Sequence, residues 1–295
     1  MIHLFRRCNQ KCAFCSYPAE AKAESGTGLR SWLKEIAAME PGLVQISGGE
    51  PLLADLGDLV KVIAFCARTG RVVELQTNGV MLAALPPESL GSLVKALDTA
   101  NGYLNFNFPA HNAVLDLKTT GLAGAFAART KAVKDLLALG AKLRLTHVVS
   151  SLNYKETASF ASFAAATFKG RVRLQFSFIK GIGRAEGSRF IPEYRAAAPY
   201  LLKALDLCAG KGLKCEVDHI PPCFLGRHHG RSVDLAKMSA GMKGPHLTEK
   251  KKVSGCKGCG FFELCPGPRK DYIAVHPAFS PPAGLKAAAK ARGGK

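Results

Sequence analysis

Three cysteines near the start of the chain have a spacing that suits a metal cluster. Cys8, Cys12 and Cys15 lie in the segment RRCNQKCAFCSYP, separated by three and then two residues. Cysteine thiolates are common ligands of iron–sulfur clusters and of structural zinc, and both kinds of site ordinarily take four protein ligands. The segment therefore predicts either a site with one open coordination position or a fourth ligand from elsewhere in the chain.

A second group of cysteines lies near the other end, in CKGCGFFELCPGPRKDY. Its members are Cys256, Cys259 and Cys265. Cys223, in IPPCFLG, and Cys215 are two cysteines upstream of this group that could supply a fourth ligand. Four thiolates at this spacing would suit a closed iron–sulfur cluster or a structural zinc ion. Cys66 and Cys208 fall in helical patterns and, like Cys215, are most simply interpreted as small core side chains.

The sequence contains ten cysteines but no secretion signal, and this combination favours metal binding over disulfides. The opening residues, MIHLFRRCNQ, have neither a hydrophobic signal core nor a cleavage site after it. No apolar run approaches the roughly 20 residues that cross a bilayer. We therefore expect a cytoplasmic protein without membrane association, whose thiols the reducing compartment keeps free.

Strand patterns and helical patterns alternate over the first two hundred residues. Strands are expected at 2–6, 43–47, 71–77, 103–108, 142–150 and 171–178. Helices are expected at 29–39, 56–68, 88–100, 124–140, 154–168 and about 193–210. This alternation predicts an α/β fold with a parallel sheet and helices outside it. Six such units are too few for a closed barrel, so we expect a partial (β/α)6 TIM barrel, with a flat doubly wound sheet as the alternative.

Either architecture gathers functional groups at the carboxyl ends of its strands. The first cysteine group follows the first expected strand, SGGEP at 47–51 follows the second, and TNG at 77–79 follows the third. The expected elements therefore bring all three segments to one end of the sheet.

Together, CNQKCAFC and ISGGEPLL resemble the signature of the radical S-adenosylmethionine (SAM) superfamily, which combines three cysteines at this spacing with a Gly-Gly-Glu motif. The resemblance runs from Cys8 to about Tyr272. It implies that the first three cysteines hold a [4Fe–4S] cluster whose fourth iron is left open for SAM. It also implies cleavage of SAM to a 5′-deoxyadenosyl radical that abstracts hydrogen from a substrate, with a flavodoxin- or ferredoxin-type protein as electron donor.

The same resemblance implies which residues contact SAM. Gly48 and Gly49 would let the backbone approach the methionyl group, and Glu50 would accept a hydrogen bond from its ammonium. Phe14 would lie beside the adenine. Asn107 is expected near the ribose. Four further residues are expected at or near the cavity inside the partial barrel: Asn78, Ser177, Tyr17 and Arg184.

The pattern changes after residue 212. A short strand at 213–218 leads into a region rich in Gly, Pro, His and Lys, which needs a staple such as a metal to fold. The second cysteine group resembles the auxiliary-cluster region of SPASM and twitch radical SAM proteins, which implies one auxiliary [4Fe–4S] cluster on Cys223 and the group's three cysteines. We expect a radical SAM partial barrel at 1–212, a twitch-like auxiliary cluster domain at 213–280 and a disordered basic tail at 281–295.

The formal charge of +19 is concentrated toward the C-terminus, where residues 221–295 contain 14 Lys and Arg but four Asp and Glu. Such a surface attracts anions, so it could bind a nucleic acid. The alternative is a basic face that contacts only solvent. Many relatives with auxiliary clusters modify ribosomally made peptides, and we expect a radical SAM enzyme acting on a peptide. One alternative is the same chemistry on a cofactor precursor, a nucleotide or sugar metabolite, or RNA. Another is a non-catalytic zinc or iron–sulfur binding protein, which would not need SGGEP.

Overall fold

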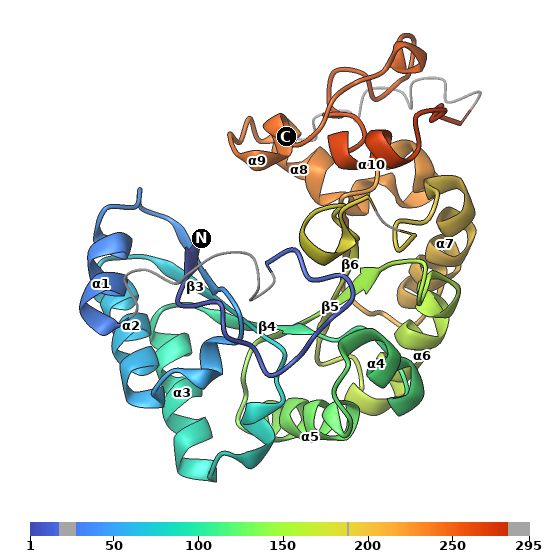
Figure 1. Cartoon of the computed structure of the whole chain (residues 1–295). Helices are drawn as coiled ribbons and strands as arrows, with labels where there is room; N and C mark the ends of the chain where they lie inside the picture. The colour runs from blue at the N-terminus through green and yellow to red at the C-terminus, as the bar shows by residue number, and fades with distance from the viewer. Residues whose placement is uncertain (18–27, 188, 283–295) are drawn as a thin grey trace.

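The computed structural model describes residues 1–17, 28–187 and 189–282. They form a seven-stranded parallel sheet whose strands follow one another in chain order. The strands are β1 (Ile2–His3), β2 (Leu43–Ser47), β3 (Val72–Thr77), β4 (Tyr103–Asn107), β5 (Leu143–Val149), β6 (Arg173–Phe178) and β7 (Cys215–Asp218). A doubly wound sheet reverses its strand order at a switch point, so that alternative is wrong. The sheet is an open, partial barrel with helices outside it (Figure 1).

The helices are α1 (Leu29–Ala37), α2 (Leu56–Arg68), α3 (Pro87–Thr99), α4 (Ala113–Thr120), α5 (Ala125–Ala138), α6 (Thr157–Phe168), α7 (Tyr194–Gly210), α8 (Val233–Ser239), α9 (Pro245–Thr248) and α10 (Lys270–Val275). The six predicted helices, α1–α3 and α5–α7, lie close to their predicted positions, and four further helices were not predicted. The sequence did not predict α4. Its start is capped by Asn112, whose side chain accepts from the Leu115 amide, and it ends at Gly121 in the left-handed region at φ 71°.

The short strand expected at 213–218 belongs to the main sheet. It pairs in parallel with β6, with Leu174 opposite Cys215 and Ser177 opposite Asp218. The sheet thus has one strand more than the six predicted. Strand β1 is shorter than expected, and its exit is held by a hydrogen bond of 3.1 Å from the Trp32 indole on α1 to the Leu4 carbonyl.

The two faces of the sheet differ in polarity because successive side chains point to opposite faces. The outer face carries buried apolar residues such as Leu75, Phe106 and Leu145, which pack beneath the helices. On the inner face, Glu74 accepts hydrogen bonds from Gln45 (3.0 Å), Tyr103 (2.7 Å), Asn105 (2.7 Å) and Arg144 (2.5 Å). Burial would raise the pKa of Glu74, but Arg144 and the hydrogen bonds outweigh it and hold that pKa below its ordinary value. The concave face of the barrel is therefore polar.

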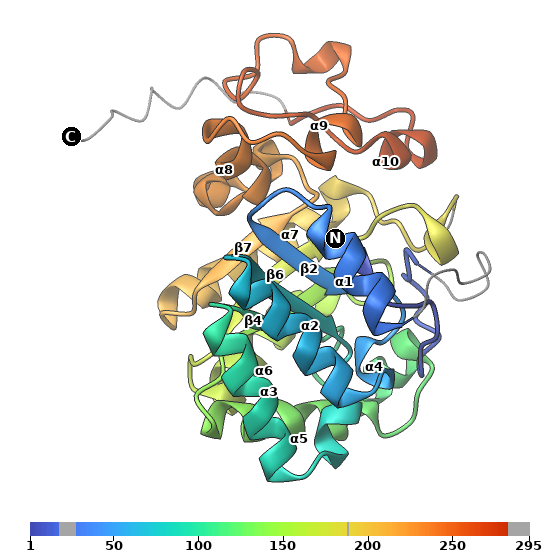
Figure 2. The same cartoon turned by 90° about the vertical axis from the view of Figure 1, so that its left-hand side faces the viewer.

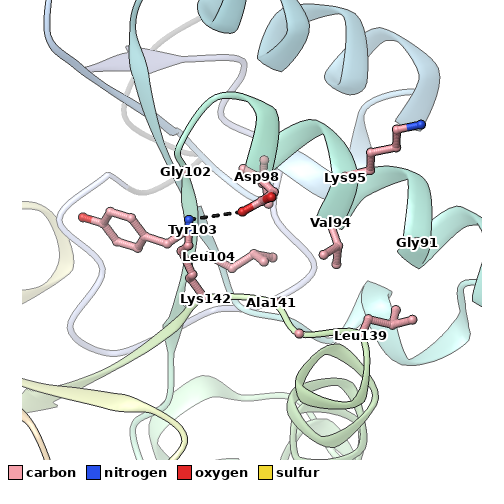
Figure 3. A pocket seen from close by; sticks show the side chains of 12 residues that line it. Gly91, Val94, Lys95, Asp98, Gly102, Tyr103, Leu104, Leu139, Ala141 and Lys142 are labelled. Carbon is pink, nitrogen blue, oxygen red and sulfur yellow. Dashed lines mark hydrogen bonds and ion pairs between the residues drawn. The ribbon is translucent and has the colours of Figure 1, made fainter.

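A cavity of about 380 Å³ lies at the amino ends of β4 and β5, beside the last turns of α3 and α5 (Figure 3). Apolar side chains including Val94 and Leu104 line it, and Lys142 reaches across to Asp98 at 3.1 Å. The cavity is at the end of the sheet opposite the cysteine segment. In barrels of this kind that end serves stability rather than chemistry.

Helices α8, α9 and α10 form a layer across one end of the molecule, next to β6, β7 and α7 (Figures 1 and 2). Aromatic and polar contacts join this layer to the barrel. The Tyr272 ring stacks on Tyr194 at 3.6 Å between centroids, and the Asp271 carboxylate accepts from the Gly181 amide at 2.5 Å. Most of the predicted basic tail, residues 283–295, lies outside the described residues. None of the described helices has the length and apolar character needed to span a membrane.

Candidate metal centres

The first cysteine segment leaves β1 and crosses the carboxyl ends of the strands (Figure 1). Its first part lies against the SGGEP turn. The Gly49 amide donates to the Phe5 carbonyl at 2.7 Å, and the Glu50 amide donates to the Arg7 carbonyl at 2.8 Å. The two motifs that the sequence analysis linked are therefore bonded directly to each other.

The later part of the segment is held from the other side of the barrel. The Lys11 amide donates to the Thr120 carbonyl at the end of α4, at 2.9 Å. The Arg184 amide, in the loop after β6, donates to the Cys15 carbonyl at 3.0 Å. The sequence predicted Arg184 near the cavity inside the barrel. It did not predict the contact with α4. The cysteine segment is thus anchored at both edges of the open barrel.

The three thiols of this segment lie near one another at different depths. Cys8 is exposed, Cys12 is buried and Cys15 is intermediate. Burial, followed by the neighbouring thiols Cys15 and Cys8, raises the pKa of Cys12 to about 12. Burial is also the main cause that raises the pKa of Cys8. The raised pKa values favour the protonated thiols. Bound iron would instead favour the thiolates, so these three cysteines fit a cluster of cationic irons.

Within the described ranges, no three His, Cys, Asp or Glu side chains converge on a position that could hold a single metal ion. A four-iron cluster distributes its thiolate ligands over separate iron atoms, so its ligands need not meet at one point. All ten cysteines are described, and those outside the first segment lie in α2, in α7, at β7 or in the C-terminal region. The first segment therefore offers three thiols without a fourth, as an open cluster site requires.

Two glycines in SGGEP make room for the cysteine segment. Gly48 has φ 121°, and a Cβ atom there would lie 2.4 Å from the Phe5 carbonyl oxygen. At Gly49 a Cβ would lie 1.8 Å from the Arg7 carbonyl oxygen and 2.4 Å from that of Arg6. Only glycine fits at either position without moving backbone. Their contact with the methionyl group of SAM stays a prediction. In the structure their role is to let the cysteine segment pass close to the SGGEP turn.

Glu50 is buried and links the ends of β2 and β3. Its Oε1 atom accepts from Thr77 Oγ1 at 2.6 Å and from the Leu52 amide at 3.1 Å, and its Oε2 atom accepts from the Asn78 amide at 2.7 Å. Burial raises the pKa of Glu50, and these hydrogen bonds oppose the rise. A carboxylate has about four acceptor positions. One is therefore left for the predicted contact with an ammonium group.

Asn78 connects the TNG turn to the cysteine segment. Its Nδ2 atom donates to Asn9 Oδ1 at 2.7 Å and lies 3.8 Å from Cys8 Sγ. Its backbone carbonyl accepts from Arg129 Nε at 2.8 Å. The Arg129 side chain on α5 is fully buried and pairs with Asp116 on α4. This buried ion pair beneath the cysteine segment was missed by the sequence analysis.

Replacing Arg129 with methionine is expected to cost about 3–5 kcal/mol of unfolding free energy, because it leaves the Asp116 charge buried without its partner. Denaturant unfolding of the full chain measures this change. The double variant Arg129→Met/Asp116→Leu is expected to recover part of the loss, since no buried charge remains. A single-variant cost below about 1 kcal/mol would show that the pair does not hold this corner together.

Three other predicted SAM contacts occupy the carboxyl end of the barrel or its rim. Asn107 ends β4, and its Oδ1 atom is buried without a hydrogen-bond partner among the described residues. Such an orphaned acceptor fits a hydroxyl donor. Ser177 lies on β6 opposite Asp218, and Phe14 is half-buried and packs against the core. The roles of all three remain predictions.

The second cysteine group meets Cys223 around one apolar pocket. The lining includes Cys223, Cys256, Cys259, Cys265, Phe261, Phe262 and Phe279. Burial raises the pKa of Cys223, with the other three thiols as further causes, and burial raises that of Cys265 to about 11. The Gly267 amide donates to Cys265 Sγ at 3.3 Å, an interaction that helps set the properties of cluster sulfurs. Cys215 does not line this pocket, so the structure brings Cys223 rather than Cys215 to the group.

Comparisons with known proteins agree with this geometry. The model of the radical SAM superfamily matches residues 2–164. The chain is 25% identical over 233 residues to PqqA peptide cyclase of Methylocella silvestris, covering 77% of this chain and 60% of that protein. It is 24% identical over 225 residues to pre-heme d1 synthase of Dinoroseobacter shibae, covering 73% and 53%. The chain thus spans little more than half the length of these two relatives.

The crystal structure of Streptococcus suis SuiB bound to S-adenosylmethionine has the same fold. It superposes with a TM-score of 0.64 at 13% sequence identity, over 92% of this chain and 72% of that chain. At this identity the likeness concerns the fold alone.

Proposed function

Because the chain belongs to the radical SAM superfamily, we propose that it cleaves SAM reductively at a [4Fe–4S] cluster held by Cys8, Cys12 and Cys15, and that it modifies a peptide. The observation that carries the proposal is the direct bonding of the three-cysteine segment to the SGGEP turn at the carboxyl end of the sheet. When bound, the cluster supplies one electron that converts SAM to methionine and a 5′-deoxyadenosyl radical, which abstracts hydrogen from the substrate.

The residues of this chain would bind and orient SAM. Glu50 keeps one acceptor position for an ammonium, Asn107 offers an orphaned acceptor, and Phe14 offers an aromatic face at the rim. Asn78 holds the segment that carries Cys8, so it positions the cluster ligand. A fixed set of donors and acceptors reduces the reorganisation that binding requires.

A peptide is the substrate class that these features favour. PqqA peptide cyclase, the relative named above, acts on a peptide by its name. Partly exposed polar side chains of the concave face, such as Ser47 and Ser177, can pair with the amide groups of a bound chain. The likeness to pre-heme d1 synthase keeps a cofactor precursor as a second candidate. The formal charge of +19 also suits docking of an acidic electron donor of the flavodoxin or ferredoxin type.

The test of SAM cleavage is an anaerobic assay of the iron-loaded chain with SAM and dithionite. We expect 5′-deoxyadenosine as a product, measured by liquid chromatography. A peptide encoded beside the gene, offered with deuterium at its carbon positions, should transfer deuterium into that product. Zinc without iron in the purified chain, or no 5′-deoxyadenosine from reduced protein, would contradict the proposed chemistry. Transfer from a labelled cofactor precursor instead of the peptide would favour the second candidate.

We propose further that Cys223, Cys256, Cys259 and Cys265 hold an auxiliary [4Fe–4S] cluster. Their common pocket supports this proposal, and structural zinc is the competing occupant. Replacing Cys223 with alanine is expected to lower iron from about eight to about four per chain. The matched control Cys215→Ala removes a thiol outside that pocket and should leave iron unchanged. Metal analysis decides the outcome, and equal iron loss in both variants would contradict the assignment.

A further inference from the structure

A buried side-chain amide lies against the middle cysteine of the first segment. Gln10 is 5% exposed and Cys12 is 8% exposed. The Cys12 thiol donates a hydrogen bond to Gln10 Oε1, with 3.3 Å between the two atoms. The other polar atom of this amide, Gln10 Nε2, is buried and has no hydrogen-bond partner among the described residues. Burial of such a donor costs about 1–3 kcal/mol unless the functional state offers it an acceptor.

The backbone on both sides of Cys12 is held by α4. The Lys11 amide donates to the Thr120 carbonyl at 2.9 Å, and the Ala13 amide donates to the Thr119 carbonyl at 3.0 Å. Both threonines are fully buried in the last turn of the helix. Because these bonds fix the chain around the cysteine, the neighbouring amide is kept close to its sulfur. The amide can still turn about its last torsion, which has two broad minima that exchange the oxygen and the nitrogen.

The state of the Cys12 sulfur decides which atom of the amide can face it. A protonated thiol donates and the carbonyl oxygen accepts, as in the structure. A thiolate bound to iron has no proton and can only accept. Two acceptors 3.3 Å apart would repel each other, and the repulsion is strong in a buried site. Iron binding therefore favours the turned amide, which directs the Nε2 hydrogens toward the sulfur.

We propose that Gln10 sets the reduction potential of the first centre by donating a hydrogen bond from Nε2 to Cys12 Sγ in the iron-loaded protein. The proposal rests on the [4Fe–4S] cluster proposed above for the first three cysteines. A hydrogen bond to a ligand sulfur stabilises the reduced cluster more than the oxidised one, because the reduced cluster carries one more negative charge. Gln10 thus raises the potential, so that one electron passes more readily from dithionite or a protein donor to the cluster.

The proposed auxiliary centre offers a comparison within the same chain. Its sulfurs accept from backbone amides, from Gly267 to Cys265 Sγ at 3.3 Å and from Phe261 to Cys259 Sγ at 3.5 Å. A change of side chain at Gln10 leaves these backbone donors in place. The auxiliary centre therefore serves as an internal reference for the potential.

The experiment is an anaerobic potentiometric titration of the full chain with both centres loaded with iron. Dithionite is added in steps with redox mediators, and electron paramagnetic resonance measures the reduced clusters. SAM added to a separate sample identifies the first centre, since only a cluster with an open iron should change its signal. In Gln10→Met, which keeps a similar shape without a donor, the ratio of reduced to oxidised first centre at a fixed potential should fall about tenfold. That fall is a shift of about 59 mV to lower potential.

Two further variants control for shape and for the loss of an amide elsewhere. Gln10→Glu replaces the donor with a carboxylate of the same shape, so its first centre should be at least as hard to reduce. Gln45→Met removes an amide that donates to Glu74 on the inner face, and both centres should keep their potentials. A change below about twofold in the ratio for Gln10→Met would overturn the proposal. An equal shift of both centres, or a weaker affinity for SAM with no shift, would also overturn it.

A second measurement keeps the test decisive if a Gln10 variant fails to assemble its first centre. The unaltered chain is produced with ¹⁵N in the side-chain amides of glutamine and reduced. Pulsed electron paramagnetic resonance of the SAM-sensitive cluster should then detect a coupled ¹⁵N nucleus that the unlabelled chain lacks, and its absence would overturn the proposal. An unaltered chain with about four irons and no SAM-sensitive signal would overturn the proposed first cluster, and this inference with it.

Discussion

Replacing Cys8, Cys12 and Cys15 together with alanine is expected to abolish 5′-deoxyadenosine formation and to lower iron from about eight to about four per chain. We expect the remaining iron at the proposed auxiliary site, whose pocket is lined by Cys223, Cys256, Cys259 and Cys265 and shares no ligand with the first segment. Because the three thiols are the cysteines gathered at that end of the barrel, no nearby cysteine can substitute for them. Iron analysis and product chromatography measure the two effects in the same sample.

The control for this variant is Cys66→Ala, which removes one thiol buried in α2 and should change neither iron nor product. A triple variant that retains all its iron would show that the first segment does not hold a cluster. A variant that loses nearly all of its iron would show instead that the two centres depend on each other for assembly.

Replacing Gly49 with alanine is the second change with a large expected effect. The new Cβ would lie 1.8 Å from the Arg7 carbonyl oxygen, so backbone must move, and the hydrogen bonds from the Gly49 and Glu50 amides to the cysteine segment are lost or stretched. Overpacking of this kind costs about 1–3 kcal/mol. We expect more than a tenfold loss of 5′-deoxyadenosine formation, together with loss of iron from the first centre, while the auxiliary centre retains its iron.

Gly91→Ala in α3 is a matched control, because nothing lies within 4 Å of the added Cβ. Alanine in a helix interior is favoured over glycine by about 1 kcal/mol, so this variant should be slightly more stable and fully active. Thermal unfolding measures both stability changes, the small gain expected for Gly91→Ala and the loss expected for Gly49→Ala. If Gly49→Ala retained both iron and activity, the contact between SGGEP and the cysteine segment would not be required to position the cluster ligands.

The sequence predicted those parts of the fold whose signals are local. Strand β2 and helix α2 have the predicted bounds, because each combines a strong period with clear turn residues at both ends. Helix α4 was missed because apolar side chains face outward and a charged one faces inward, the reverse of the usual amphipathic pattern. Val114 and Leu117 are exposed, whereas Asp116 faces inward. The capping residues Asn112 and Gly121 were the signal that could have revealed it.

The parts of the site that could not be predicted depend on tertiary contacts. Arg129 falls in an ordinary helical pattern, and its burial follows from Asp116 on another helix and from the Asn78 carbonyl on a strand exit. Cys215 was interpreted as a core residue, and the hydrogen bond that its carbonyl accepts from Arg231 appears only in the folded chain, where Arg231 lies beside β7. By contrast, the order of the cysteine, SGGEP and TNG segments was enough to place them at one end, because parallel strands all end there.

The hydrogen bond between the Arg184 amide and the Cys15 carbonyl sets an order for assembly on the ribosome. Because each strand pairs with the one made before it, the sheet can grow as the chain emerges, starting from β1 and β2. The cysteine segment is among the first parts to be made, yet its last anchor is synthesised only after β6. The nascent chain therefore acquires the anchors of this segment one after another, first at SGGEP and then at Thr120, and the full set is present only when the barrel is nearly complete.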